Sequence, residues 1–384
     1  MKKIGFIPLR KGSKSIKNKN KKKMLGRPLF SWVLVEAMFS KLDEIYVFTD
    51  DEEIFEYVNK EYKWSNKVKV LERSKKSASD TASTELAMKE FVEAIKNNYD
   101  LLMLLQATSP LTTREDINKA LEMINYYDSV ISVVEFKRFF WKENGTPINY
   151  DYNNRPRRQE FKGTLIENGA IYLTTREQFE KTGVRVGGNI GVLKMPEETA
   201  YEIDEPNDWI VIENLLKNRL KKSKKELDKI KVVVLDVDGV FTDSSVYYDN
   251  NGEFSKKFNM KDGMGISILK EYDIEIIVIT SEDSEIVRKR MGKLGIENLY
   301  MGIKDKYAFL EKLIIEKKLK RSEIAYLGDD INDYANILSC GWGICPKDAV
   351  EEIKNEADVI ISKNGGNGFI RESARFILKY NERF

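Results

Sequence analysis

Two aspartates separated by one residue stand directly after an apolar run in the second half of the chain. The run Val232–Leu235 leads straight into Asp236, Asp238 and Gly239. An uninterrupted and mostly β-branched run of this kind predicts a strand that is buried on both faces of a parallel sheet. Carboxylates at the carboxyl end of such a strand lie where open α/β sheets place their chemistry. Glycine then allows the chain to turn sharply just beyond the pair.

Three further pieces follow in a fixed order. Thr280 ends the apolar run Ile274–Thr280, Lys306 precedes a predicted helix, and Asp329 lies in a Gly-Asp-Asp-x-x-Asp segment after another apolar run. The order DxDG, strand-end Thr, Lys and GDDxxD resembles the four motifs of the haloacid dehalogenase (HAD) phosphotransferases. The resemblance implies a second domain with a Rossmann-like fold and phosphatase chemistry.

The resemblance also assigns roles to these residues. Asp236 would attack the phosphorus of a phosphate ester, and Asp238 would protonate the leaving alcohol and then activate water. Thr280 and Lys306 would steady the phosphate oxygens. Mg²⁺ would be held by Asp236, by the main-chain carbonyl of Asp238 and by Asp329, because hard cations prefer oxygen ligands. The neighbouring Asp330 would orient Lys306 or water near the metal.

The spacing between the first two motifs limits the size of this domain. About 40 residues separate Asp238 from Thr280, and they are filled by a predicted hairpin around Asn250-Asn251-Gly252 and one helix. A large cap domain does not fit. With FNMKDG and GGNGFIRE, residues 230–380 resemble the capless 3-deoxy-D-manno-octulosonate 8-phosphate phosphatases and their nonulosonate 9-phosphatase relatives. Those relatives are tetramers whose hairpin and C-terminal tail help to close neighbouring sites.

Two residues after the second motif bear on the choice of sugar. Where octulosonate phosphatases commonly read Thr-Gly-Arg, this chain reads Thr280-Ser281-Glu282, and Lys293 follows eleven residues later. This pair resembles the nonulosonate 9-phosphatase variant, in which the two residues contact the C5 substituent. On an ideal helix they are about 16 Å apart. Joint contact with one sugar would therefore need a fold-back at the turn or help from another subunit.

A long cationic loop dominates the first half of the chain. The segment Leu9–Lys23 holds seven lysines together with Arg10, Gly12 and two serines, and it follows the predicted first strand Lys3–Leu9. Backbone N–H groups and cations in such a loop can wrap a triphosphate. Composition alone leaves open a solvated basic loop or an RNA-contacting patch.

Further segments favour nucleotide binding over a solvated or RNA-contacting loop. ASDTAS, LQATSPL, RPRRQ, ENGAIY and EIDEPNDW occur in this order, and together they resemble the CMP-sialate synthetases over roughly residues 1–218. The resemblance implies a Rossmann-like nucleotidyltransferase with a dimerising arm at about residues 136–161. It places the CTP phosphates, the rest of the nucleotide, the acceptor sugar and Mg²⁺ on the following residues: Arg10, Ser13, Lys14, Asn20 and Lys21 for the phosphates; Arg73 and Ser79 for the nucleotide; Gln106 for the sugar; Asn168 for the substrate; Glu202 and Asp204 for the metal.

Two departures from the family pattern stand out. The loop of the family is usually RGGSKGIPxKN, whereas this chain reads RKGSKSIKNKN, so two glycines and a proline are replaced. The metal-binding pair, usually Asp-x-Asp, is Glu202-x-Asp204. If this segment is a strand, the spacing of two puts both carboxylates on one face.

The composition sets wider limits. The chain has 384 residues, no histidine, a net charge of +2 and two cysteines, Cys340 and Cys345. The absence of histidine excludes His-based triads and imidazole metal sites. No apolar run approaches a membrane span, and a short apolar run at the N-terminus predicts a strand rather than a signal peptide. Two thiols in a long chain favour a reducing cytoplasm and buried side chains.

Alternating strands and helices predict an α/β protein with mostly parallel sheets. We expect two domains, 1–224 and 225–384, joined by the charged run Asn218–Lys229. The predicted activity is bifunctional: CTP-dependent activation of a nonulosonate and Mg²⁺-dependent dephosphorylation of the nonulosonate 9-phosphate, with no nucleic-acid or membrane partner. We expect a homo-oligomer, dimeric through the first domain and tetrameric through the second. Two alternatives remain: the same reactions on the eight-carbon octulosonate, or a second domain that serves only assembly.

Overall fold

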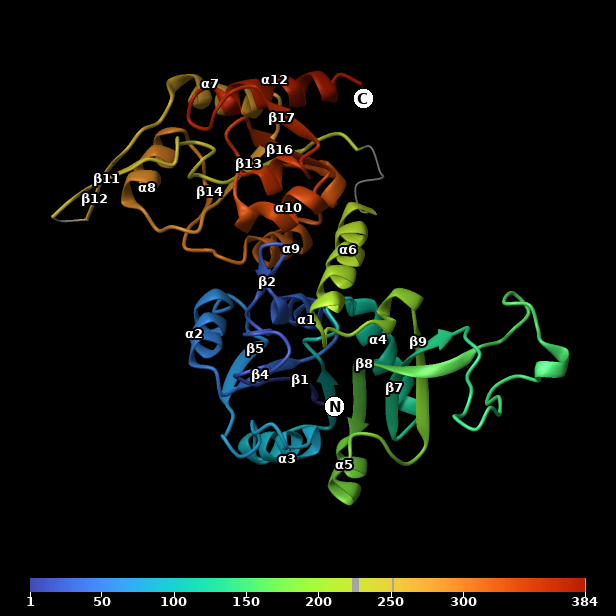
Figure 1. The fold of residues 1–384 in the computed structure, drawn as a ribbon. Helices are drawn as coiled ribbons and strands as arrows, with labels where there is room; N and C mark the ends of the chain where they lie inside the picture. The colour runs from blue at the N-terminus through green and yellow to red at the C-terminus, as the bar shows by residue number, and fades with distance from the viewer. Residues whose placement is uncertain (223–227, 251, 384) are drawn as a thin grey trace. The chain divides into compact units, whose positions relative to one another are not determined.

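The computed structural model describes residues 1–222, 228–250 and 252–383 (Figure 1). Contacts divide the chain into two compact units, Met1–Lys22 with Pro28–Leu215, and Lys23–Arg27 with Leu216–Phe384. The predicted domain boundary near residue 225 lies outside the described residues. Across the described ranges, no helix is both long and apolar enough to cross a membrane.

The first unit is built on a seven-stranded sheet with the order β5-β4-β1-β6-β8-β7-β9. β1 pairs in parallel with β4 and β6, whereas β8 runs antiparallel to β6 and β7, so the mostly parallel sheet is confirmed. Its strands are β1 (Lys3–Leu9), β4 (Glu44–Thr49), β5 (Val68–Glu72), β6 (Leu101–Leu105), β7 (Ser129–Phe136), β8 (Thr164–Thr175) and β9 (Ile190–Met195). A separate small sheet pairs β2 (Lys23–Met24) with β3 (Arg27–Pro28).

Helices cover both faces of this sheet. On one face, Met88 and Phe91 of α3 and Phe179 of α5 pack against Phe6 and Phe48 of the central strands. Side chains from N-terminal caps begin several helices; Ser83, for example, accepts from the Leu86 N–H at the start of α3. The helices are α1 (Leu29–Met38), α2 (Glu52–Glu61), α3 (Thr84–Ala94), α4 (Arg114–Met123), α5 (Arg176–Thr182) and α6 (Pro206–Lys222), with short 3₁₀ turns η1 (Ile124–Tyr126), η2 (Tyr152–Asn154) and η3 (Glu197–Ala200).

The segment between β7 and β8 extends away from the sheet of the first unit (Figure 1). It holds a cluster of aromatic rings in which Phe139 contacts Tyr150 and Phe161. Trp141 and Tyr152 remain exposed. The segment at residues 136–161 that the resemblance assigns to a dimerising arm thus projects from the sheet, and its part in dimerisation stays a prediction.

The second unit contains a six-stranded sheet in which every neighbouring pair is parallel, with the order β14-β13-β10-β15-β16-β17. Its strands are β10 (Val232–Leu235), β13 (Glu275–Ile279), β14 (Asn298–Tyr300), β15 (Ile324–Leu327), β16 (Trp342–Pro346) and β17 (Val359–Ile361). The predicted hairpin is formed by β11 (Val246–Asp249) and β12 (Gly252–Lys256); its turn residue Asn251 is outside the described residues.

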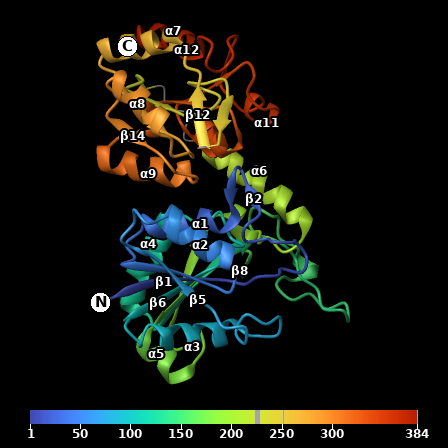
Figure 2. The ribbon, with the colours of Figure 1, turned by 90° about the vertical axis from the view of Figure 1, so that its left-hand side faces the viewer.

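In the second unit, α7 and α12 lie side by side in both views (Figures 1 and 2). Ile266 and Leu269 of α7 meet Phe369, Ile370 and Ile377 of α12 in one core with the residues of β10. The helices are α7 (Met260–Glu271), α8 (Glu285–Lys293), α9 (Lys306–Lys317), α10 (Tyr334–Ser339), α11 (Glu351–Lys354) and α12 (Phe369–Asn381), with 3₁₀ turns η5 (Arg321–Glu323) and η6 (Ile331–Asp333). Because β10 lies between β13 and β15, the residues that follow these three strands share one edge of the sheet.

Candidate active sites

In the second unit, Asp236 directly follows β10 and its side chain is buried. The chain then turns at Gly239, whose φ is +83°. A Cβ atom on Gly239 would lie 1.8 Å from Oδ2 of Asp329. Glycine is therefore needed here both for the positive φ and for the close approach of a second carboxylate.

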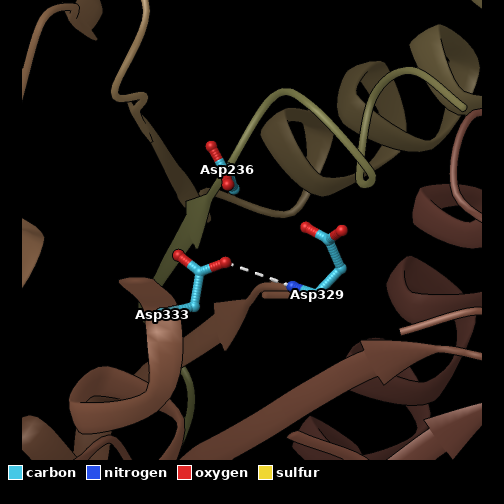
Figure 3. Close-up of side chains that lie close together, drawn as sticks. All are labelled: Asp236, Asp329 and Asp333. Atoms are coloured by element: carbon cyan, nitrogen blue, oxygen red, sulfur yellow. Dashed lines mark hydrogen bonds between the residues drawn. The ribbon is translucent and has the colours of Figure 1, made fainter. Parts of the chain in front are cut away.

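Thr280 and Asp329 follow the two strands that flank β10. Thr280 is buried after β13, and its N–H donates to the Tyr300 carbonyl at 3.0 Å. Asp329 lies two residues beyond Leu327, the last residue of β15. Figure 3 shows the carboxylates of Asp236, Asp329 and Asp333 gathered at this edge. The structure thus brings together the strand-end residues that the motif order predicted.

Lys306 is the first residue of α9, and the Asp305 side chain caps that helix by accepting from the Ala308 N–H. The Lys306 Nζ lies 2.5 Å from Asp236 Oδ2 and 2.8 Å from Asp333 Oδ1, and the side chain is fully buried. Burial alone would lower the pKa of Lys306, but the charges of Asp236 and Asp333 outweigh it and raise the pKa. Lys306 is therefore a permanently charged ammonium beside the expected nucleophile.

Asp333, which sequence reasoning left without a role, is the acidic partner of Lys306. Its Oδ1 also accepts from the Tyr326 hydroxyl at 2.7 Å, and its Oδ2 accepts from the Asp329 N–H at 3.1 Å. Asp330, expected to orient Lys306 or water near the metal, is exposed and accepts from its own neighbour, the Ile331 N–H. Lys306 pairs with Asp333 in its place, and a role of Asp330 toward water stays a prediction. The 3₁₀ turn η6 explains this correction, because it carries the chain round so that Asp333 rather than Asp330 faces the sheet.

The carboxylates at this edge are short of positive charge. Ligand atoms of Asp236, Asp329 and Asp333 lie within 4.8 Å of one another. Burial, followed by the charges of Asp333 and Asp236, raises the pKa of Asp329 to about 9, and Asp329 Oδ1 has no hydrogen-bond partner among the residues that the structure describes. Burial also raises the pKa of Asp236, and Lys306 opposes that rise.

A divalent cation would relieve these shifts, so the cluster fits a metal site. Both oxygens of Asp333 already accept from donors. Both oxygens of Asp236 also accept, from the Val237 N–H and from Lys306, so these donors do not separate Asp236 from Asp333. The assignment of Asp236 and Asp329 as ligands stays a prediction of the motifs.

Asp238 lies on the turn after β10, and its side chain is 30% exposed. Its carboxylate accepts from Lys256 and from the Thr242 hydroxyl. Glu282 and Lys293 lie just before α8 and at its last residue, and both are exposed. Within the described residues, no hydrogen bond or ion pair joins these two, so their joint contact with a sugar stays a prediction.

The first unit has a cavity of about 440 Å³ beside the cationic loop. It is lined by residues from the loop after β1, from residues 73–87, from the end of β6 and from the segment before α6. The lining includes these predicted residues: Arg10, Ser13, Lys14, Asn20, Arg73, Ser79, Gln106, Glu202 and Asp204. The structure therefore gathers most of the predicted nucleotide site into one cavity.

Two cations of the loop face a carboxylate across this cavity. Asp80 accepts from Arg10, and its second oxygen lies 3.0 Å from the Lys14 Nζ. The Lys14 ammonium and the Arg10 guanidinium hold the pKa of the exposed Asp80 below its ordinary value. Both cations are thus positioned where an anion can be bound.

Lys19 is a further lining residue that sequence reasoning missed. Its Nζ donates to the Ile203 carbonyl at 2.6 Å and lies 3.4 Å from Asp204 Oδ1. Lys21, predicted to hold phosphate, does not line the cavity and is paired with Asp51 and Glu53 at 3.1 and 2.8 Å. The sequence already indicated Lys19, because the final Lys-Asn of the RGGSKGIPxKN pattern falls on Lys19 and Asn20.

Glu202 and Asp204 both line the cavity, although the segment that carries them is not a strand as the spacing argument assumed. Burial, then the charge of Asp204, raises the pKa of Glu202 to about 7. Gly169 has φ +65°, and a Cβ there would lie 2.2 Å from the Glu202 carboxylate. Two carboxylates held together without sufficient positive charge fit a cation site.

Asn168 lies outside this lining. Its side chain is buried, accepts from the Ser132 hydroxyl at 2.7 Å and donates to the Thr199 hydroxyl at 3.0 Å. Through these two hydrogen bonds Asn168 connects β8 with β7 and with η3. Cys340 and Cys345 are buried, as expected, and among the described residues neither forms a disulfide.

Comparison with known proteins agrees with both motif sets. A family model described as cytidylyltransferase matches residues 4–233, and one described as haloacid dehalogenase-like hydrolase matches residues 202–372. The chain is 31% identical to N-acylneuraminate cytidylyltransferase B of Danio rerio, over 98% of this chain and 90% of the relative. It is 34% identical to N-acylneuraminate cytidylyltransferase of Oncorhynchus mykiss, over 97% and 88%.

The second unit alone resembles a smaller protein. The 3-deoxy-D-manno-octulosonate 8-phosphate phosphatase KdsC of Haemophilus influenzae is 38% identical over 154 residues, which cover 40% of this chain and 86% of the relative. Together these matches confirm the two resemblances that the motifs indicated.

Proposed function

Because the chain belongs to the cytidylyltransferase family and joins that domain to a haloacid dehalogenase-like hydrolase domain, we propose that it is a bifunctional enzyme of nonulosonate metabolism. The hydrolase domain would release phosphate from a nonulosonate 9-phosphate. The cytidylyltransferase domain would then join the freed sugar to CMP from CTP and release pyrophosphate. Two buried cysteines that form no disulfide within the described residues support a cytoplasmic setting for both reactions.

One observation carries the hydrolase half of this proposal: buried Asp236 lies 2.5 Å from the Lys306 ammonium at the edge shared by three strand ends. In the proposed reaction an Asp236 oxygen bonds to phosphorus as the bond from phosphorus to the sugar oxygen breaks. Asp238 gives a proton to the departing sugar oxygen. Asp238 then takes a proton from water, which attacks the phosphorus of the aspartyl phosphate and regenerates Asp236.

The residues at this edge also support Mg²⁺ as the cofactor. Asp236, Asp329 and the Asp238 carbonyl would hold the ion, which when bound offsets the charge between a carboxylate nucleophile and a phosphate dianion. Lys306 and Thr280 would hold the phosphate oxygens, and Asp333 would keep Lys306 in place.

The cavity of the first unit supports the transferase half. Arg10, Lys14 and Lys19 would bind the CTP phosphates, while Glu202 and Asp204 would hold a second Mg²⁺. A hydroxyl of the sugar attacks the α-phosphorus, and the bond to pyrophosphate breaks. Positioning and charge neutralisation supply most of the acceleration in transfers of this kind.

The choice of sugar rests on Glu282 and Lys293. A glutamate after Thr280 disfavours an anionic substrate group that an arginine would attract, and this supports the nonulosonate over the octulosonate. We expect 2-keto-3-deoxynonulosonate 9-phosphate or N-acetylneuraminate 9-phosphate to be preferred over octulosonate 8-phosphate. Glu282→Arg should erode that preference, and faster turnover of the octulosonate by wild type would contradict it.

Assembly is the second part of the proposal. The projecting segment between β7 and β8 supports a dimer through the first domain, and exposed Tyr248 and Phe254 on the hairpin support a tetramer through the second. Sedimentation velocity on the full chain measures this directly. A hydrolase domain used only for assembly is the competing function.

A two-stage assay tests the proposal. A panel of sugar phosphates is incubated with the full chain, with and without Mg²⁺, and phosphate release is measured. Each dephosphorylated product is then offered with CTP, and pyrophosphate release is measured. We expect both signals for a nonulosonate. Absence of phosphate release on every substrate, with normal CMP transfer, would support the assembly role.

A further inference from the structure

Lys256, at the end of β12, is buried against the turn that carries Asp238. Its side chain is 2% exposed, and its Nζ donates to both carboxylate oxygens of Asp238, at 2.6 and 2.8 Å. Hydrogen bonds between two charged groups are shorter and stronger than neutral ones. An ammonium this well buried is costly unless it is paired. The contact therefore belongs to the built interior of the second unit and differs from an exposed surface ion pair.

A second donor restricts the same carboxylate. The Thr242 hydroxyl donates to Asp238 Oδ1 at 3.2 Å. Because Lys256 donates to both oxygens of Asp238 and Thr242 donates to one, these two residues fix the plane of the Asp238 carboxyl group from one side. The side chain of Asp238 still keeps 30% of its surface exposed. One side of the group is thus held while the other remains open to a substrate.

The hairpin that carries Lys256 has an independent anchor. Glu253, on the same strand, accepts from the Ser284 hydroxyl at 2.9 Å, and Ser284 is the N-cap of α8. Loss of the Lys256 ammonium would therefore leave β12 attached to the unit. A change at Lys256 can then be assigned to Asp238 rather than to loss of the hairpin.

The next residue provides a matched comparison. Lys257 has the same side chain, but it is 65% exposed and pairs at 3.2 Å with Asp243. An exposed pair of this kind contributes little. The two neighbouring lysines differ chiefly in what they touch.

We propose that Lys256 is a positioning residue of the phosphatase reaction, which orients Asp238 so that its open side faces the leaving oxygen of the substrate. The inference rests on the proposed function, in which Asp238 transfers a proton to that oxygen. Lys256 acts through Asp238 and does not contact the phosphoryl group. Its effect should therefore depend on how strongly the leaving group needs a proton.

Two substrates separate this role from a structural one. A sugar phosphate releases a poor leaving group that needs protonation, whereas p-nitrophenyl phosphate releases a good one that does not. The ratio kcat/KM reports events up to the first irreversible step, which includes departure of the alcohol. General acid catalysis is worth about 10²–10⁴-fold. Lys256→Met should therefore lower kcat/KM for the sugar phosphate about 10- to 100-fold, and for the aryl phosphate less than about threefold.

Other substitutions in the same chain serve as controls. Lys257→Met should leave both ratios near wild type, and Lys256→Arg, which keeps the charge and donors, should recover part of the loss. In an Asp238→Asn background, Lys256→Met should add less than about a twofold loss, because its partner is already disabled. Thermal unfolding of the same variants reports whether the hydrolase unit is folded, and Lys256→Gln replaces Lys256→Met if that variant fails to fold.

Equal losses on both substrates, or no loss on either, would overturn the inference. A further loss in the Asp238→Asn background would also contradict it, because Lys256 would then act by another route. Failure of the proposed function looks different: wild type would not hydrolyse a nonulosonate 9-phosphate. The Lys256 comparison would still be made with whichever alkyl phosphate wild type hydrolyses.

Discussion

In the hydrolase unit the charged groups follow neighbouring parallel strands and are buried, whereas in the transferase unit they lie on loops around an open cavity. Asp236 and Lys306 are 2.5 Å apart with the lysine fully enclosed. Arg10 and Lys14 instead share the exposed carboxylate of Asp80. The first arrangement is set by the sheet before any ligand arrives, and the second by side chains that can change partners.

This difference indicates how each unit fixes the geometry of its reacting groups. A buried ion pair is strong and inflexible, and removal of one member leaves an uncompensated charge. A solvated pair contributes little by itself but can be exchanged for a phosphate. We therefore expect substitutions in the hydrolase unit to be severe and those around the cavity to be graded.

The largest expected effect is the loss of the nucleophile. Asp236→Asn should lower phosphate release by at least about a thousandfold, because an amide cannot form the acyl phosphate. CMP transfer to free sugar should stay within about twofold of wild type, since the two motif sets lie in separate units. Asp283→Asn, at an exposed aspartate, is the control. Loss of both activities in a folded Asp236→Asn variant would contradict the separation.

The next effect distinguishes two aspartates of one motif. Asp333→Asn should lower phosphate release about a hundredfold, because a charge-assisted contact to Lys306 worth about 2–3 kcal/mol is lost. Asp330→Asn should cost less than about threefold, since Asp330 points outward. Thermal unfolding should show the same order, with only Asp333→Asn clearly destabilised. The reverse order would return Asp330 to the role first expected of it.

A smaller effect is expected in the cationic loop. Lys19→Met and Arg10→Ala should each lower kcat/KM for CTP about tenfold or more, because a charge-assisted contact to phosphate is worth about 1.5–3 kcal/mol. Lys21→Met should cost less than about threefold, since Lys21 is paired outside the cavity. Steady-state pyrophosphate release measures all three. Equal losses for Lys19 and Lys21 would show that the loop rearranges around the triphosphate.

The smallest effect is a pH dependence of metal binding in the transferase unit. Because the pKa of Glu202 is raised to about 7, the group must lose a proton to bind a cation. Affinity should therefore rise about threefold from pH 6.5 to 7.5. Calorimetric titration of Mg²⁺ into Asp329→Asn protein isolates this site, and Glu202→Gln should abolish the dependence. A constant affinity in Glu202-containing protein would mean that Glu202 is not a ligand.

The raised pKa of Glu202 also predicts how the stability of the fold depends on pH. Glu202 stabilises the metal-free fold fully below the ordinary glutamate pKa, and that contribution is lost as the pH rises through about 7. We compare the free energy of unfolding of metal-free wild type with that of metal-free Glu202→Gln protein. The wild-type value minus the variant value should be lower at pH 8 than at pH 4. Denaturant titrations at the two pH values compare them.

The strands were the most predictable part of the fold. The strands Val232–Leu235 and Lys3–Leu9 were predicted with the bounds that the structure shows, because buried apolar runs have few other solutions. Helix ends were less predictable. The pattern of apolar residues from Thr84 favours a helix as far as Asn97, whereas α3 ends at Ala94, since Lys96 and Asn97 take positive φ values that this pattern does not reveal.

The site residues divide in the same way. Asp236 and Asp329 were predictable because strand ends meet at one edge of a parallel sheet. Asp333 was not, because the spacing in GDDxxD does not say which carboxylate a 3₁₀ turn directs inward. Lys256 depends on a hairpin with a register shift between Tyr247 and Tyr248, which alternation cannot show. Lys19 stands among seven lysines without periodicity, so only its place in the RGGSKGIPxKN pattern distinguishes it.

The enclosure of Lys306 has a consequence for covalent labelling. Acylating reagents attack neutral, accessible amines, and Lys306 is neither, since it is fully buried and its pKa is raised. Lys14, whose side chain is 73% exposed, offers the opposite case. Graded acylation should therefore silence nucleotide transfer while phosphate release persists, and occupancy of the cavity by CTP should slow the modification of Lys14 and of Lys19, which also lines it.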